Sequence, residues 1–176
     1  ANGTALALSS IGAPDLLTAV AGSGAADVVA VGFDGVIHRW NGTAWAPEAS
    51  GTTSVLTSVW AMSATNQLAV GQGGLALRWN GSAWASESTG SAAWLEDVWA
   101  ADANNVFVVG SGGTVLYHNG TSWSATPTSG TTVDLHGVFG FTTSNVWAVG
   151  DGGVIRYWGG SSWASQSSGV TANLRA

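Results

Sequence analysis

The chain has 176 residues, of which 45% are hydrophobic and 8% are charged, and it carries four arginines, no lysine and a net charge of −6. So few cations exclude a surface that follows a phosphate backbone, and we expect no nucleic-acid partner. The sequence has no apolar run long enough to span a membrane, no signal-peptide pattern and no cysteine for disulfide or thiol chemistry.

The composition also bears on location. Because lysine is absent, the polar surface must be built mainly from Ser, Thr, Asn and Gly, which suits an exported bacterial protein in its mature form. We therefore expect an extracellular, cell-surface or periplasmic location.

A ten-residue segment, 36–45, recurs along the chain at nearly constant spacing. It returns at 75–84, 114–123 and 154–163, in steps of 39, 39 and 40 residues. A fixed period of this length is typical of a fold that stacks one supersecondary unit. We expect one repeat domain over 1–176, with a partial unit at 1–13, repeats at 14–52, 53–91, 92–131 and 132–170, and the start of a further unit at 171–176.

Each repeat predicts four short strands. In chain order, a strand of the outermost type is expected first, at 4–9. In the second repeat, β-branched and aromatic runs alternate with Gly-rich or Asn-rich turns, as in an antiparallel meander. These runs lie at 56–60, 68–70, 75–79 and 82–85, and the last full strand is expected at 162–167.

The turns between the third and fourth runs share an Asn-Gly pair. It occurs as Asn41-Gly42, Asn80-Gly81 and Asn119-Gly120, and it predicts two-residue type I′ hairpins because Asn and Gly tolerate positive φ. No window shows a helical period, so we expect no helix.

Four short strands per repeat predict an all-β fold, a β-propeller of about four to five short four-stranded antiparallel blades. Leu68 and Val70 share one strand face while Ala69 takes the other, which fits blades covered on both sides. A solenoid or β-helix is the competing repeat fold. Because both ends carry the same outermost strand type, either one end is surplus, or the chain is a segment or half of a larger ring, or two copies complete one ring.

The last full unit, Val146 to Trp163, resembles the blades of two known groups. One comprises short-blade bacterial propellers similar to the photosystem II assembly-factor and Asp-box families, and the other comprises the tectonin-type lectins. The resemblance covers every repeat and implies the propeller fold, with assembly or carbohydrate binding as the activities of these groups. The outer hairpin motif Asn-Gly-Thr/Ser-Ala/Ser-Trp is shorter than an Asp-box.

An enzyme is not expected. A sialidase-like site would need converging arginines, whereas Arg39, Arg78 and Arg156 lie on successive equivalent strands. The sequence has no catalytic triad order, no paired-carboxylate motif and no His spacing suited to a metal, so we predict no catalytic residues, no metal site and no cofactor.

A repeat column is the set of residues at equivalent positions of successive repeats. Candidate binding residues lie in columns whose residue type changes from repeat to repeat while the neighbouring columns keep theirs. One column, at the start of each innermost strand, is expected at the mouth of the central channel, although solvated strand entries would look the same. It contains Thr18, Thr57, Glu96, His136 and Arg175. A second column replaces leucine with His38 and Arg156 and indicates water-filled clefts between particular blades, with a half-buried histidine as the alternative.

Aromatic side chains add further candidates. Trp40, Trp79 and Trp158, interrupted by His118, precede the hairpin turns and offer rings that could stack on a sugar, although core packing would also account for them. The full candidate ligand-binding set is Trp40, Trp79, Trp158, His38, Arg39, Arg78, His118, Glu96, His136 and Arg156.

Two functions from different classes remain open. The first is a non-catalytic binding module that recognises carbohydrate in several weak between-blade sites and gains avidity from their number. The alternative is a protein-interaction or assembly scaffold within a larger extracytoplasmic complex. The expected partner is therefore a glycan or a protein surface, and self-association could complete the ring.

Overall fold

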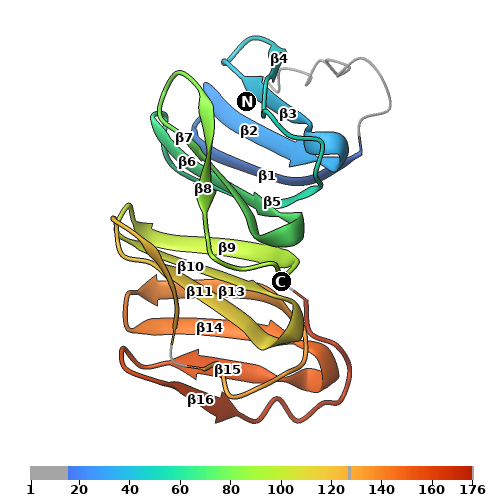
Figure 1. The fold of residues 1–176 in the computed structure, drawn as a ribbon, viewed down its shortest axis with the longest axis vertical. Helices are drawn as coiled ribbons and strands as arrows, with labels where there is room; N and C mark the ends of the chain where they lie inside the picture. The colour runs from blue at the N-terminus through green and yellow to red at the C-terminus, as the bar shows by residue number, and fades with distance from the viewer. Residues whose placement is uncertain (1–15, 127, 176) are drawn as a thin grey trace, which may run out of the picture.

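The computed structural model describes residues 16–126 and 128–175 and folds them into four antiparallel four-stranded sheets, the blades of a β-propeller (Figure 1). In each blade the strands neighbour one another in chain order. Blade 1 contains β1 (Leu17–Gly24), β2 (Asp27–Gly32), β3 (Ile37–Trp40) and β4 (Trp45–Glu48). Blade 2 contains β5 (Leu56–Ser63), β6 (Asn66–Gly71), β7 (Leu75–Trp79) and β8 (Trp84–Ser88).

The other two blades repeat this plan. Blade 3 contains β9 (Leu95–Asp102), β10 (Asn105–Gly110), β11 (Thr114–His118) and β12 (Trp123–Ala125). Blade 4 contains β13 (Leu135–Thr142), β14 (Asn145–Gly150), β15 (Ile155–Trp158) and β16 (Trp163–Gln166). The predicted all-β class and four-stranded antiparallel blades are confirmed, whereas the strand predicted at 4–9 lies outside the described residues.

Alternation along each strand sends neighbouring side chains into different cores. Leu68 and Val70 of β6 pack between blades 2 and 3, whereas Ala69 packs between blades 1 and 2. A third core lies between blades 3 and 4. The innermost strands pack in the order β1, β5, β9, β13, so blades 1 and 4 stand at the two ends of the stack (Figure 1).

The predicted type I′ hairpins are wrong. In the turn after β3, Gly42 has a φ of 95°, but Asn41 is not among the residues with positive φ. The Asn41 side-chain oxygen instead accepts hydrogen bonds from the backbone N–H groups of Thr43 and Ala44, each at 3.0 Å. The side chain therefore closes a four-residue loop, and Trp40 pairs with Trp45 across it.

A one-turn 3₁₀ helix joins the second and third strands of each blade, where the sequence predicted only a glycine turn. These are η1 (Phe33–Gly35), η2 (Gln72–Gly74), η3 (Ser111–Gly113) and η4 (Asp151–Gly153). The middle residue has positive φ and is glycine in every blade except blade 1, where Asp34 has a φ of 55°. None of the helices in the described ranges is long and apolar enough to cross a membrane.

Candidate functional site

The innermost strands of all four blades enclose a hollow of about 480 Å³ at the hub. Its lining comes from residues 19–22 of β1, 58–61 of β5, 97–98 of β9 and 138–139 of β13. Most of these residues are apolar, and Asp97 is the charged residue among them. The hub therefore has one polar centre, which connects neighbouring blades.

Asp97 links blades 2, 3 and 4. One carboxylate oxygen accepts a hydrogen bond from Ser58 Oγ at 2.7 Å, and the other accepts one from the Val138 backbone N–H at 2.9 Å. Burial raises the pKa of the Asp97 carboxyl, and these hydrogen bonds offset only part of the rise. Sequence reasoning missed Asp97, although its column, Ala19, Ser58, Asp97 and Gly137, holds a single charged residue.

The column predicted at the channel mouth contains two kinds of residue. The hydroxyl groups of Thr18 and Thr57 link neighbouring blades, because each donates a 2.6 Å hydrogen bond to a leucine carbonyl of the next blade. The acceptors are the carbonyl groups of Leu56 and Leu95. These two threonines therefore have structural partners within the fold.

Glu96 and His136 of the same column lie within electrostatic reach of each other. His136 Nε2 lies 2.8 Å from Asp151 Oδ1, while its buried Nδ1 has no hydrogen-bond partner among the described residues. Burial raises the pKa of Glu96, and the charge of His136 opposes that rise. No group of three or more His, Asp or Glu side chains in the described part of the chain could hold a metal ion.

The predicted tryptophan column lies mainly between blades. Trp79 and Trp158 are both buried, and the Trp79 indole N–H donates a 3.0 Å hydrogen bond to the Ala64 carbonyl. The rings of Trp79 and Trp84 are tilted, with centroids 5.6 Å apart. Trp40 of blade 1 is half-buried. The buried rings contribute to the interblade cores and present little surface to a ligand.

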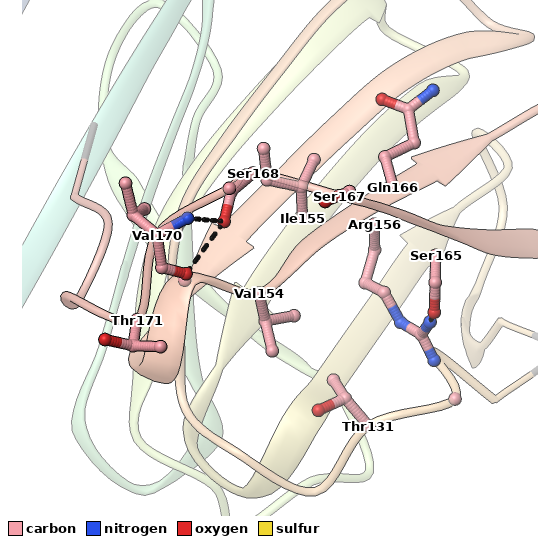
Figure 2. Close-up of a pocket in the computed structure, with 13 residues that line it drawn as sticks. Thr131, Val154, Ile155, Arg156, Ser165, Gln166, Ser167, Ser168, Val170 and Thr171 are labelled. Atoms are coloured by element: carbon pink, nitrogen blue, oxygen red, sulfur yellow. Dashed lines mark hydrogen bonds between the residues drawn. The ribbon is translucent and has the colours of Figure 1, made fainter.

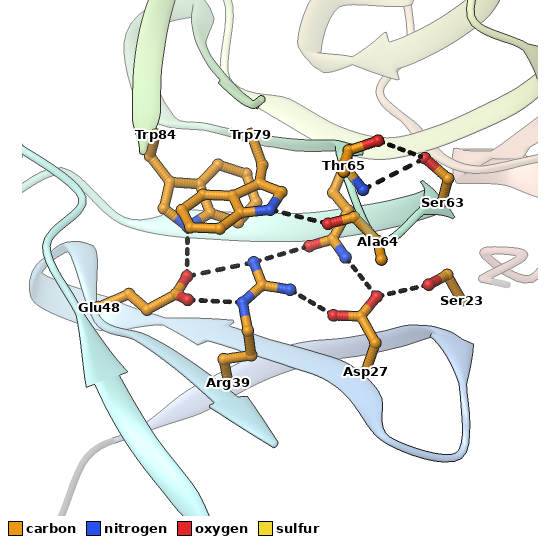
Figure 3. A network of polar contacts seen from close by, with 10 residues as sticks. Ser23, Asp27, Arg39, Glu48, Ser63, Ala64, Thr65, Trp79 and Trp84 are labelled. Atoms are coloured by element: carbon orange, nitrogen blue, oxygen red, sulfur yellow. Dashed lines mark hydrogen bonds and ion pairs between the residues drawn. The ribbon is translucent and has the colours of Figure 1, made fainter. Parts of the chain in front are cut away.

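Arg39 organises a polar network between blades 1 and 2 (Figure 3). Its guanidinium donates to the carboxylates of Asp27 and Glu48, each at 2.5 Å. Arg78 repeats this arrangement in blade 2 with Glu87, also at 2.5 Å. Because the fold itself supplies the acidic partners, these two arginines already have their charges compensated.

The two other histidine candidates are also buried. His38 lies on β3, in the column that holds leucine in blades 2 and 3. His118 replaces tryptophan at the end of β11, and its Nδ1 accepts a 3.1 Å hydrogen bond from the Gly120 backbone N–H. Burial and the charge of Arg78 lower the pKa of His118, against the opposing influence of Glu87. His118 therefore closes its hairpin turn in the neutral form.

Arg156 differs from the other arginine candidates in the face of the sheet from which its side chain projects. It aligns with Leu77 and Leu116, one position before the column of Arg39 and Arg78, so its side chain leaves the opposite face of the sheet. It is only 7% exposed and donates a hydrogen bond to Ser165 Oγ of the paired strand β16. The sequence identified Arg156 as a residue that replaces leucine in its repeat column, and in the structure this side chain is buried.

The guanidinium of Arg156 lines a cavity of about 410 Å³ at the outer edge of blade 4 (Figure 2). Arg156 Nε is buried without a hydrogen-bond partner, and no carboxylate of the described residues forms an ion pair with this side chain. Besides Arg156, the polar lining consists mainly of hydroxyl-bearing residues together with one amide, and comes from Thr131, Ser165, Gln166, Ser167, Ser168 and Thr171. The cavity therefore combines a buried cation with neutral hydrogen-bonding groups.

Comparison with known proteins identifies similar folds. A solved structure described as YCF48 bound to D1 peptide has a TM-score of 0.66 and 16% identity, and the match covers 89% of this chain and 54% of that chain. YCF48 from Cyanidioschyzon merolae has a TM-score of 0.68 and 18% identity, with coverage of 90% and 58%. No family model and no curated protein sequence matches the chain.

The chain spans little more than half the length of these two structures. Identities this low show the fold alone, so the predicted resemblance to assembly-factor propellers is confirmed for the fold, and the Asp-box and tectonin resemblances remain predictions. The described residues form four blades of a β-propeller of the kind seen in YCF48.

Proposed function

We propose that the chain is a non-catalytic protein-interaction propeller that binds a carboxylate group of a partner protein in the Arg156 cavity. The observation that carries this proposal is the buried guanidinium, which has an unpartnered Nε and no acidic partner among the described residues. The scaffold alternative is thus favoured over carbohydrate recognition, since the tryptophans needed for sugar stacking are largely buried.

Burial of the Arg156 guanidinium has a cost in free energy. Removing a cation from water is unfavourable unless an anion or several hydrogen bonds replace the lost hydration. The carboxylates of Glu48 and Glu87 replace the lost hydration of Arg39 and Arg78. Arg156 has one hydroxyl group, that of Ser165, in this role. A bound carboxylate would supply the missing charge, and a guanidinium presents paired N–H groups that match it geometrically.

The cavity and the fold are both compatible with this ligand. Its volume of about 410 Å³ falls within the range of sites that hold a small group or a peptide side chain. The hydroxyl groups around Arg156 could donate to a carboxylate without bringing a competing charge. One of the structurally similar propellers was solved with a peptide bound, which supports a protein partner for this fold.

The test follows the Arg156 Nε–H signal by NMR in ¹⁵N-labelled protein. The probes are acetyl-Gly-Gly-Glu-amide, which offers a side-chain carboxylate, and acetyl-Gly-Gly-Gly with a free C-terminus. Acetyl-Gly-Gly-Gln-amide is the matched neutral control. We expect a saturable shift with one or both carboxylate peptides and no shift with the control, and the responding peptide identifies the source of the carboxylate.

Because the variant Arg156→Leu lacks the Arg156 Nε–H signal, the variant is compared with wild type at the backbone amides of Ser165 and Thr171, which line the cavity. The responding carboxylate peptide should shift these amides in the wild type and leave them unshifted in the variant. Leucine occupies the aligned positions Leu77 and Leu116, so this variant keeps the packing of the column and should remain folded. If neither carboxylate peptide shifts the Arg156 Nε–H signal of the wild type, the proposal is contradicted. Equal responses to the peptides and to free acetate would overturn the protein-partner part of it.

A further inference from the structure

We infer that the hollow at the hub binds a small organic ammonium ion, whose charged group contacts the Asp97 carboxylate while its apolar body fills the rest of the hollow. The lining of the hollow shares no residue with the Arg156 cavity, so the two sites are separate. Ser58 of blade 2 and Val138 of blade 4 both hydrogen-bond to Asp97 of blade 3. The polar centre is therefore built at internal contacts between consecutive blades, whatever covers the outer faces of the first and last blades.

The Asp97 carboxylate has hydrogen-bond donors but no cation beside it. Its donors are the hydroxyl group of Ser58 at 2.7 Å, the backbone N–H of Val138 at 2.9 Å and the backbone N–H of Val98. No arginine or histidine of the described residues forms an ion pair with Asp97. By contrast, the carboxylate of Glu48 at the interface of blades 1 and 2 meets an arginine at 2.5 Å.

This carboxylate can accept a further bond from a ligand. An ionised carboxylate offers about four lone-pair sites on its two oxygens, and the three donors leave capacity for another. Burial raises the pKa of Asp97, and no charged side chain contributes to that shift. Neutral donors alone therefore offset the cost of burying the ionised form, and an ammonium group beside it would supply the opposite charge.

The rest of the hollow suits an apolar group. Its volume of about 480 Å³ falls within the range of small-molecule sites, which are mostly apolar and hold a few placed polar groups. Trp60 belongs to the lining, and aromatic rings attract cations at short range. The apolar lining on β5 and β9 comes from Val59, Trp60, Ala61 and Val98.

The shape of the lining favours a compact ligand over an extended side chain. Four strands contribute to the hollow, so a ring or branched body can touch several of them at once, whereas an unbranched lysine side chain would touch fewer. Among the described residues, Asp97 is the one carboxylate that lines the hollow, too few oxygen ligands for a metal ion that requires about six. An aryl-alkyl ammonium ion therefore fits the site best.

Titration of ¹⁵N-labelled protein with 2-phenylethylammonium near neutral pH tests the inference. The readout is the backbone amide signal of Val138, because this N–H donates to Asp97. We expect a saturable shift of that signal. The neutral analogue 2-phenylethanol has the same body without the charge and should bind at least about tenfold more weakly.

Two variants separate the charge of the site from its space. Asp97→Asn removes the charge and should weaken binding by at least about tenfold, with the Val138 amide still present as the readout. Ala61→Leu keeps Asp97 but adds volume to the lining, so it should also weaken binding. Asp102→Asn is the matched control, since Asp102 lies at the exposed end of the same strand and does not line the hollow.

The pH dependence of binding gives an independent readout. Protonation of Asp97 removes its charge, so the affinity of the wild type should rise from about pH 4 to 7, whereas the affinity of Asp97→Asn should stay constant. The ammonium group keeps its proton over this range. The other titratable residues on β9 and on the elements packed against it are Glu96, Asp102 and His136, and none of them lines the hollow.

Several outcomes would overturn the inference. They are a Val138 signal that does not shift, equal binding of 2-phenylethanol, an affinity that does not change with pH, or an equal loss of binding in Asp102→Asn, which would indicate attraction to the net negative charge of the protein. Acetyl-Gly-Lys-Gly-amide carries its ammonium group on an extended side chain. If this peptide bound as tightly as 2-phenylethylammonium, a small-molecule ligand would be ruled out in favour of a lysine side chain.

Discussion

At the scale of single residues, Arg156 gives the first prediction, which concerns stability. Replacing this buried, uncompensated guanidinium by leucine removes a desolvation cost and restores the side chain found at Leu77 and Leu116. We expect Arg156→Leu to raise the free energy of unfolding by about 1 to 3 kcal/mol. Urea denaturation at neutral pH measures the change.

Arg78→Leu is the control for that prediction. It removes a cation of the same kind but leaves the carboxylate of Glu87 without its 2.5 Å partner. We expect this variant to be destabilised by about 1 to 3 kcal/mol, the opposite sign. Destabilisation of similar size in both variants would show that Arg156 is compensated within the fold.

Asp97 gives a prediction about pH. Because burial raises the pKa of this carboxyl above its ordinary value of 3.8, the folded state holds the proton more tightly than the unfolded state. Its contribution to stability is therefore fully present below 3.8 and is lost as pH rises through the raised pKa. Asparagine does not titrate, so Asp97→Asn should gain stability relative to wild type as pH rises from about 4 to 7.

The Asp97→Asn variant can keep the local geometry, because its amide oxygen can accept from Val138 N–H while its NH₂ group donates to Ser58 Oγ. Guanidinium unfolding of both proteins at several pH values gives the difference in unfolding free energy directly, so contributions of other groups cancel. A difference that does not change with pH would show that the carboxyl is not perturbed in the folded state.

Residue-scale features were predictable where a repeat column changed character. Arg156 and His118 stand out because leucine and tryptophan occupy their aligned positions. The partners of these side chains were not predictable. A repeat column identifies the strand face that a side chain takes, but it does not show whether the neighbouring blade places a carboxylate next to that face. Arg39 meets Glu48 and Arg156 does not meet a described carboxylate, and both facts depend on contacts across strands.

At the scale of elements, the 3₁₀ turn of blade 1 gives the next prediction. Asp34 has a φ of 55°, in the region where a side chain strains the backbone, whereas the aligned residues are glycines. Asp34→Gly should therefore stabilise the protein by about 0.5 to 1 kcal/mol. Thermal or urea unfolding measures the gain.

The reverse change provides the control. Gly73 has a φ of 71° and no atom within 4 Å of the place where a Cβ would stand, so Gly73→Asp tests backbone strain without a steric clash. We expect a loss similar in size to the gain at Asp34. No effect at either position would indicate that this turn relaxes without cost.

The strands were predictable as elements because glycine and asparagine mark both ends of each short apolar run. The loop after β3 was predicted incorrectly, since the Asn-Gly pair fits a type I′ turn as well as a capped loop. The deciding contact is the Asn41 side chain bonded to Ala44 N–H, together with the Trp40 pairing that sets loop length. Both contacts involve residues outside the Asn41-Gly42 dipeptide, namely Ala44, Trp40 and Trp45.

At the scale of the whole molecule, the sequence predicted a stack of blades but left its closure open. Identical columns recur in every repeat, so Val20 and Val59 look equivalent in sequence although one is exposed and the other is buried. Exposure depends on whether another blade covers the face, which the column itself does not record. The structure identifies the two uncovered faces as those of blades 1 and 4.

This arrangement predicts uneven stability along the stack. Blades 2 and 3 are covered on both faces, whereas blades 1 and 4 each have one open face, and a repeat protein gains much of its stability from contacts between neighbouring repeats. Native-state amide hydrogen exchange should therefore be slowest in β6 and β10 and faster in the equivalent strands β2 and β14. Dilute protein, in which any self-association is weakest, gives the clearest gradient.

The amide exchange rates of the four second strands, β2, β6, β10 and β14, decide this prediction because these strands are equivalent in the four blades. Protection that is uniform over all four blades at low concentration would contradict the gradient, because a blade with one uncovered face would then be as stable as a blade enclosed by two neighbours.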